Sequence, residues 1–214
     1  MTNPAQRNRA IQLFAVAAGL LPAAALIVAA LTGDLGANPV ERVTHVTGDW
    51  ALRFLLLSLS VTPLRRLLGW RWVAPLRRTL GLTAFGYACS HFLTYLVLDH
   101  FFDWRAIVED VLERRYVTAG FSALLCLVPL AATSTRAMIR RLGRRWIPLH
   151  RLAYLAAALG VIHFLWLVKS DLREPLVYAA VLALLLGLRL GFWLVGSRSR
   201  KPSAKEAESQ PSRV

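Results

Sequence analysis

The sequence predicts an all-α membrane protein, a bundle of six transmembrane helices with both chain termini in the cytoplasm. Two observations support this prediction. First, 56% of the 214 residues are hydrophobic and 18% are charged, and the apolar residues occur in long runs of about 20, the length that crosses a bilayer core of roughly 30 Å. Second, the net charge is +14, and the basic residues lie mainly in alternate segments between the runs. This composition excludes a soluble enzyme and a disordered protein, and it favours lipid headgroups over nucleic acid as partners of the arginines.

Six apolar runs occupy most of the chain. Because every backbone polar group inside lipid must be hydrogen-bonded within its own segment, we expect each run to form an α-helix. The runs cover residues 10–31, 50–68, 80–102, 116–134, 149–168 and 176–195. The first follows Arg7 and Arg9 as in a signal peptide, but its 22 residues exceed the usual apolar core of about 7–15, so we expect a retained helix. The second is shorter and contains Pro63.

The basic residues orient this bundle. The segments before the first run, between the second and third, between the fourth and fifth, and after the sixth carry 2, 5, 5 and 5 Lys or Arg, where the second count includes Arg65 and Arg66 at the end of the second run; the three alternate loops carry 1, 3 and 2. Positive charge accumulates on the cytoplasmic side of membrane proteins. Both termini are therefore predicted to be cytoplasmic.

Two segments outside the runs have patterns of their own. In residues 103–115 apolar side chains recur at helical spacing after Asp103, which suits an N-cap. We expect a short outer helix that serves as a lid or, through Glu109, Asp110 and Glu113, as a docking surface. Residues 197–214 are polar and lack aromatic side chains, so we expect a disordered cytoplasmic tail after a transmembrane domain of residues 1–196.

Two of the five histidines, His91 and His163, lie deep inside apolar runs. An imidazole in hydrocarbon is costly unless it is hydrogen-bonded or coordinated, so an intramembrane histidine is a candidate functional residue. Both runs are predicted to cross from inside to outside, and the two histidines lie eleven and fourteen residues from the inner ends. At about 1.5 Å per residue their depths agree within roughly 5 Å, which suits a bis-histidine haem site between two helices.

The alternative is that each histidine hydrogen-bonds a neighbouring helix. A proton relay would normally add a carboxylate, and no Asp or Glu lies deep in an apolar run. Small and aromatic residues that share a face with the histidines could accommodate a haem. The small ones would let the porphyrin approach the helix backbone, and the aromatic ones would enclose it. These neighbours are Tyr87, Ala88, Thr94 and Tyr95 around His91, and Leu159, Gly160, Trp166 and Leu167 around His163.

A third histidine, His150, lies thirteen residues before His163, about 20 Å along a helix axis. That distance leaves room for a second haem, but the partner position on the third helix falls near Arg77 or Arg78, which do not ligate iron in the ordinary way. His150 could ligate a second haem with an unusual partner, bind a quinone or flavin, or lie at the membrane interface.

The remaining histidines and the arginines have simpler expectations. His45 and His100 are expected to be solvated at the outer surface. Arg53 could pair with haem propionates or extend to lipid headgroups. Two inner clusters could attract a flavin phosphate or an acidic reductase, or could serve only to set the topology; they are Arg65, Arg66, Arg71, Arg77 and Arg78, and Arg140, Arg141, Arg144 and Arg145.

Three segments resemble the bacterial MsrQ (YedZ) family. They are residues 90–95 (SHFLTY), 146–154 (WIPLHRLAY) and 162–164 (IHF). This family is the haem-binding membrane subunit of the periplasmic methionine-sulfoxide reductase system and belongs to the ferric-reductase-like transmembrane domains, which include the NADPH oxidases.

The resemblance implies a multi-pass protein of the bacterial inner membrane with haem b held by His91 and His163. His150 matches the family's third histidine, so the number of haems is one or two, and a bound FMN is implied without assigned contacts. Electrons would come from the quinone pool or a cytosolic flavin reductase. They would pass to a periplasmic molybdopterin-containing catalytic subunit that reduces methionine sulfoxide in damaged envelope proteins.

The residues themselves agree with an electron-transfer subunit rather than a catalytic one. A bis-histidine iron has both axial positions filled, which favours electron transfer, and the chain shows no nucleophile–base arrangement. One alternative is a transmembrane ferric reductase or oxidase component that works with a separate NAD(P)H–flavin reductase. A second is a haem-free transporter, with helix breaks at Pro22, Pro63 and Pro129, and a purely structural anchor is a third.

Overall fold

A computed structural model describes residues 3–198, which contain helices and no strand. The long helices are α1 (Pro4–Leu31), α2 (Pro39–Leu67), α3 (Leu76–Thr94), α5 (Arg115–Ala132), α8 (Leu152–Leu167) and α9 (Arg173–Arg198). The short ones are η1 (Arg71–Val73), the π-helix η2 (Tyr95–Asp99), α4 (Trp104–Glu113), α6 (Arg136–Leu142), η3 (Gly143–Arg145) and α7 (Trp146–Leu149). Each of the six apolar runs coincides with a long helix. The tail prediction falls mostly on residues 199–214, outside the described residues, while α9 continues through Ser197 to Arg198.

The protein is a multi-pass membrane protein. Four helical stretches are long and apolar enough to cross a bilayer: Ala5–Leu31, Arg71–Asp99, Arg115–Ala132 and Arg173–Val195. A fifth is counted if Arg136–Leu149 and Leu152–Leu167, bent by 49° at their junction, form one broken span. Helix α2 is not among them, since it carries Asp49 and Arg53. Six crossings and cytoplasmic termini therefore stay predictions.

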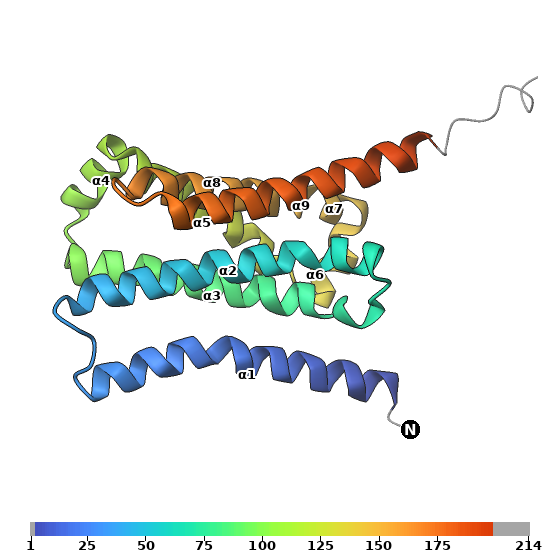
Figure 1. Cartoon of the computed structure of the whole chain (residues 1–214), viewed down its shortest axis with the longest axis horizontal. Coiled ribbons are helices and arrows are strands. Elements are labelled where there is room, and N and C mark those ends of the chain that lie inside the picture. The colour runs from blue at the N-terminus through green and yellow to red at the C-terminus, as the bar shows by residue number, and fades with distance from the viewer. Residues whose placement is uncertain (1–2, 199–214) are drawn as a thin grey trace, which may run out of the picture.

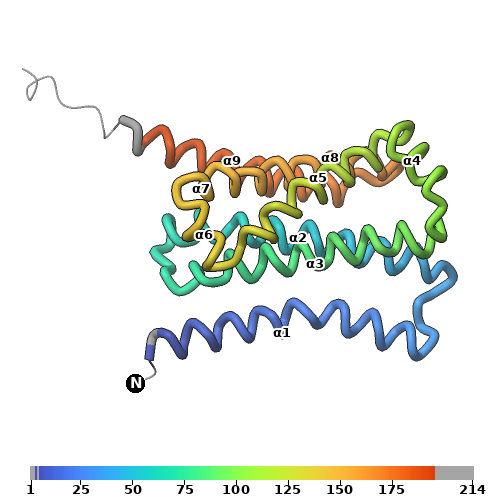
Figure 2. Tube along the Cα trace, turned by 180° about the vertical axis from the view of Figure 1, so that it is seen from behind, coloured from blue at the N-terminus to red at the C-terminus, as the bar shows by residue number. Residues whose placement is uncertain are grey.

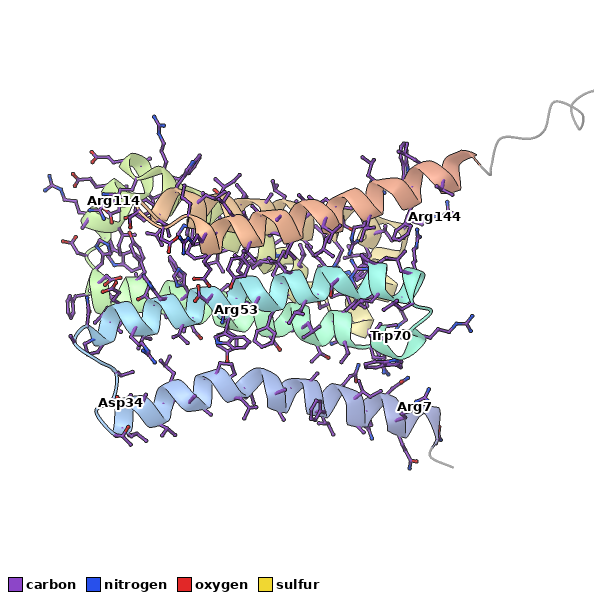
Figure 3. The ribbon with its side chains drawn as sticks, in the orientation of Figure 1. Arg7, Asp34, Arg53, Trp70, Arg114 and Arg144 are labelled. Carbon is purple, nitrogen blue, oxygen red and sulfur yellow. The ribbon has the colours of Figure 1, made fainter. Side chains whose placement is uncertain are left out.

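The long helices lie side by side in three layers (Figures 1 and 2). Helix α1 flanks α2 and α3, and α5, α8 and α9 lie on the far side of that pair. Figure 3 places Arg7, Trp70 and Arg144 at one end of the bundle and Asp34 and Arg114 at the opposite end. We call the first the inner end and the second the outer end, following the charge pattern. The three basic segments that fall within the described residues thus lie at one end, as the sequence assigned them.

Helix α2 begins at Pro39, well before the apolar run at Trp50. The side chain of Asn38 accepts a hydrogen bond from the Glu41 amide, and Pro39 occupies the first turn, where its missing amide hydrogen is harmless. Hydropathy does not mark this end of the helix, because a helix that continues beyond lipid need not be apolar. The extra turns place Thr44 and Gly48 beside α3.

The hydroxyl of Tyr87 joins α1 to α3. It donates to the carbonyl of Gly19 at 2.8 Å and accepts from the amide of Ala23 at 3.0 Å, two groups that would bond each other in an undisturbed helix. Pro22 lies between them, and an inserted side chain at a proline is a common cause of helix bending. Tyr87 therefore anchors α1.

Small residues allow the central helices to approach. Ala84 of α3 and Ala156 and Ala157 of α8 are fully buried, and Leu59 of α2 is 1% exposed. Close backbone approach at small residues is typical of helix pairs in membranes. The buried core lies among α2, α3, α5, α8 and α9, with α3 packed mainly on α2 and α8 mainly on α5.

Candidate functional site

His91 of α3 and His163 of α8 face each other across the bundle. Their ring centroids are 6.0 Å apart and their planes are inclined by 80°. An imidazole nitrogen binds a metal ion at about 2 Å and the ring centre lies about 1 Å behind it, so two rings on opposite sides of one ion are about 6 Å apart. The structure thus brings these two predicted site residues to the separation that suits axial ligands of one iron. We call them the histidine pair.

Each ring of the histidine pair is tied to a backbone carbonyl on the preceding long helix. Nδ1 of His91 lies 2.9 Å from the carbonyl oxygen of Thr44 in α2, and Nδ1 of His163 lies 2.6 Å from that of Tyr116 in α5. A carbonyl only accepts, so Nδ1 must carry the hydrogen in both rings. This tautomer leaves the lone pair on Nε2, as in protein metal sites whose histidines donate their second nitrogen to a carbonyl.

The donor set fits a haem. Two neutral imidazoles with Nε2 free supply two axial ligands, and a porphyrin supplies the four in the plane. Of the neighbours named from the sequence, Tyr87 bonds to α1 through its hydroxyl, and the hydroxyl of Tyr95 lies near Asp110. A Cβ at Gly160 would touch only Leu52, at 3.5 Å.

The predicted outer helix exists as α4, and the side chain of Asp103 caps it by accepting from the amides of Arg105 and Ala106. Its Asp110 is buried, and its carboxylate oxygens lie 3.1 Å from Nε2 of His100 and 3.0 Å from Nε of Arg114.

The hydroxyl of Tyr95 lies 3.4 Å from the Asp110 carboxylate. We call Tyr95, His100, Asp110 and Arg114 the Asp110 cluster. The expectation that His100 is solvated was wrong, because folding brings a carboxylate to it; His45 is exposed as expected.

The Asp110 cluster reaches the histidine pair through Tyr116. Nη1 of Arg114 donates to the Tyr116 hydroxyl at 3.3 Å, and the carbonyl of Tyr116 is the one that holds His163. The Tyr116 hydroxyl and the Asp110 carboxylate raise the pKa of Arg114 above its ordinary value, so this guanidinium is charged at any physiological pH. The outer surface is thereby connected to one of the two imidazoles.

His150 lies at the inner end, after the last residue of α7 and at the bend before α8. The bend comes before α8, so most of the thirteen residues from His150 to His163 lie in that one helix. Nε2 of His150 is 3.1 Å from Oγ1 of Thr133, and its ring stacks on Trp146 at 3.9 Å. Since the Thr133 hydroxyl donates to the Pro129 carbonyl at 2.6 Å, it accepts from His150, and Nε2 carries the hydrogen.

A cavity of about 250 Å³ opens beside His150. Arg77 and Arg78, the positions expected opposite His150, both line it, together with Ser134 and Trp146. With Ser58, which also lines it, the structure gathers one imidazole, two guanidinium groups and two hydroxyls at the inner end. Their chemistry suits a polar or anionic ring compound, and no second histidine of the described chain lines the cavity.

Arg53 holds helices together. Its Nε donates to the Tyr178 hydroxyl at 2.7 Å, and Nη2 lies 3.2 Å from Glu174 and 3.5 Å from Asp49. These partners come within reach because α9 packs against α2, and pairing of Arg53 with haem propionates or headgroups stays a prediction.

Arg189 was not singled out from the sequence. Its guanidinium lies over the ring of Tyr154, 4.8 Å from the centroid, and bonds the Tyr154 hydroxyl and the Leu59 carbonyl. No local signal identifies these partners, since they come from α8 and α2. Its contacts tie α9 to the core.

Comparison with known proteins gives a consistent result. Residues 47–161 match the family model described as a ferric reductase like transmembrane component, a range that includes His91 and His150 and ends just before His163. Three similar proteins are named haem-binding subunit MsrQ of protein-methionine-sulfoxide reductase. The protein of Rhodospirillum rubrum is 53% identical over 82% of this chain and 85% of its own length. That of Herminiimonas arsenicoxydans is 51% identical over 77% of each chain. That of Azospira oryzae is 52% identical over 76% of this chain and 71% of its own length. No solved structure matches.

Proposed function

Because the chain belongs to the MsrQ family of haem-binding subunits, within the ferric-reductase-like transmembrane components, we propose that it is the electron-transfer subunit of a methionine-sulfoxide reductase system in the bacterial inner membrane. The observation that carries the proposal is the histidine pair, two imidazoles 6.0 Å apart with Nδ1 of each held by a carbonyl. His91 and His163 would be the axial ligands of one haem b.

A bound haem supplies one-electron chemistry, and filled axial positions favour electron transfer over oxygen activation. The chain's own groups do the positioning. The carbonyls of Thr44 and Tyr116 hold both rings in the tautomer with the hydrogen on Nδ1, so that the lone pair of Nε2 faces away from these carbonyls and could bind an iron. Orientation by such partners also raises the basicity of the ligand.

The inner cavity is proposed as the place where electrons enter. Its volume of about 250 Å³ lies just below the roughly 300–1,000 Å³ of sites that hold whole drug-sized ligands, so it suits a ring rather than a whole cofactor. His150, Arg77 and Arg78 could contact the ring of a quinone or of the FMN that the family resemblance implies. A second haem bound through Nε2 of His150 would require the bond to Thr133 to break first.

Helix α4 is proposed as the docking surface for a periplasmic molybdopterin-containing catalytic subunit. Glu109 and Glu113 are exposed, as are the apolar side chains of Trp104, Val108 and Leu112. Asp110, grouped with these acids from the sequence, instead points inward to His100 and Arg114. A test of docking therefore has to leave Asp110 unchanged.

The proposal is tested by the reduced-minus-oxidised visible spectrum and haem-to-protein ratio of the full chain, purified in detergent after haem-replete expression. We expect a low-spin b-type spectrum and at least one haem per chain. A colourless protein would contradict the proposal and favour a haem-free transporter. A haem protein that, once reduced, passes electrons to ferric iron or oxygen and not to a methionine-sulfoxide reductase would favour the ferric-reductase or oxidase alternative.

A further inference from the structure

Two glycines pack directly against the histidine pair. A Cβ atom placed on Gly48 of α2 would lie 3.0 Å from Nδ1 of His91, and one on Gly120 of α5 would lie 2.7 Å from Nδ1 of His163. Non-bonded carbon atoms rest about 3.5–4.0 Å apart. A side chain at either position would therefore press on the ring at the nitrogen that donates to the carbonyl.

Each glycine lies one helical turn after the carbonyl that holds the same ring. Thr44 precedes Gly48 and Tyr116 precedes Gly120 by four residues, and residues at that spacing share a helix face. In both cases 47 residues separate the carbonyl from its histidine. The α2–α3 and α5–α8 pairs thus bind an imidazole in the same way, through one backbone carbonyl and one glycine.

We propose that Gly48 and Gly120 are positioning residues for the histidine pair, an inference that rests on the proposed haem function. Each glycine lets its ring lie flat against the neighbouring helix, where Nδ1 reaches the carbonyl and Nε2 remains for the iron. The glycines act through His91 and His163 and need not contact the haem themselves.

The simpler explanation is that these glycines only let helices approach. Other glycines show what that looks like. The nearest atom to a Cβ would be Ser58 Oγ at 3.4 Å for Gly81 and Leu52 Cδ1 at 3.5 Å for Gly160, both ordinary contacts. Among the glycines in the described part of the chain, Gly48 and Gly120 are the two whose nearest neighbour is a histidine ring that already has a hydrogen bond to keep.

The expected effects differ between the two positions. At Gly120 the contact of 2.7 Å cannot persist, so Gly120→Ala should displace the His163 ring from the Tyr116 carbonyl. Loss of such a partner typically weakens a metal site about 10- to 100-fold, and we expect haem dissociation to accelerate by that factor. The midpoint potential should rise, because a less basic imidazole stabilises the ferric iron less. Gly48→Ala should act in the same direction and less strongly.

The experiment uses the full haem-loaded chain in detergent. It compares Gly48→Ala and Gly120→Ala with Gly86→Ala in α3 and Gly187→Ala in α9, where an added Cβ meets nothing within 4 Å. The measurements are haem transfer to apomyoglobin, redox titration, and the helical circular dichroism of each variant before and after haem removal. Alanine favours a helix over glycine, so the two control variants should keep their helix content and haem.

Faster haem loss and a raised potential in Gly120→Ala, with helix content like that of Gly86→Ala, would support the inference. Dissociation rates and potentials within twofold of Gly86→Ala for both variants would overturn it. So would a loss of helical signal in both haem-free variants, since that result assigns the glycines to helix packing. A wild-type chain without haem would instead contradict the proposed function, which separates the two failures.

Discussion

The histidine pair and His150 are the same residue type in one bundle, but the protein holds them by different groups. His91 and His163 donate Nδ1–H to backbone carbonyls and keep Nε2 available. His150 has Nε2 bonded to the hydroxyl of Thr133 and its ring stacked on Trp146. The histidine pair therefore leaves Nε2 without a protein partner, whereas in His150 it is Nε2 that is hydrogen-bonded.

This difference suggests different tasks. A backbone carbonyl is fixed by its helix, and a substitution at Thr44 or Tyr116 leaves it in place. A threonine hydroxyl can rotate, and a single substitution removes it. The histidine pair therefore has the rigidity expected of permanent axial ligands, whereas His150 can exchange its partner and suits a ligand that enters and leaves.

The largest expected effect separates the two sites directly. His91→Ala and His163→Ala should each abolish the low-spin b-type spectrum, because one imidazole alone cannot fill both axial positions. His150→Ala should keep that spectrum, and His45→Ala, an exposed position, serves as the control. The haem-to-protein ratio is the measurement. Equal haem loss in all three variants would remove the distinction between the sites.

The Asp110 cluster offers the next largest effect. Asp110→Ala leaves His100, Arg114 and Tyr95 without their acceptor, and an unsatisfied buried group costs about 1–3 kcal/mol. Thermal unfolding in detergent should show this loss, with haem released at lower temperature. Glu109→Ala on the exposed face of the same helix should stay within about 0.5 kcal/mol of wild type. Equal unfolding curves for Asp110→Ala and Glu109→Ala would mean that the Asp110 cluster does not stabilise the protein around the histidine pair.

Docking at the outer end should depend on the exposed acids of α4. Glu109→Lys with Glu113→Lys should slow oxidation of the reduced haem by the catalytic subunit about tenfold at low salt, since complementary charge mainly sets association rates. Stopped-flow spectroscopy measures this rate. Asp34→Lys, also exposed at the outer end, is the matched control. A rate that falls equally in the control would indicate that the total charge of the outer surface, rather than the acids of α4, sets the association rate.

The smallest effect tests the inner bond. Thr133→Val removes the partner of His150 at nearly constant volume, and one hydrogen bond is worth about 0.5–1.5 kcal/mol. We expect a change of several-fold in the rate of haem reduction by a quinol analogue, with the low-spin spectrum unchanged. Thr44→Val is the contrast, because His91 is held by the carbonyl of that residue and not by its side chain. A larger spectral change in Thr44→Val than in Thr133→Val would reverse our comparison.

Much of this arrangement is predictable from local sequence. The positions of the long helices follow from apolar runs, because lipid forces each segment to satisfy its own backbone. The matched depths of His91 and His163 follow from the constant rise of a helix. The outer helix and its cap at Asp103 follow from spacing within a few residues. None of these depends on how one helix is rotated against another.

The tertiary structure alone decided which partners these residues have. The start of α2 at Pro39, the carbonyls that hold the histidine pair, the glycines beside it, and the acids around Arg53 and His100 all come from other helices. A hydropathy pattern carries no information on rotation or neighbours, and a backbone carbonyl has no residue type to recognise. The sequence by itself determined the positions of the long helices along the chain and the similar depth of two imidazoles. The packing of α3 on α2 and of α8 on α5 determined their tautomer, because only there does an acceptor meet each Nδ1.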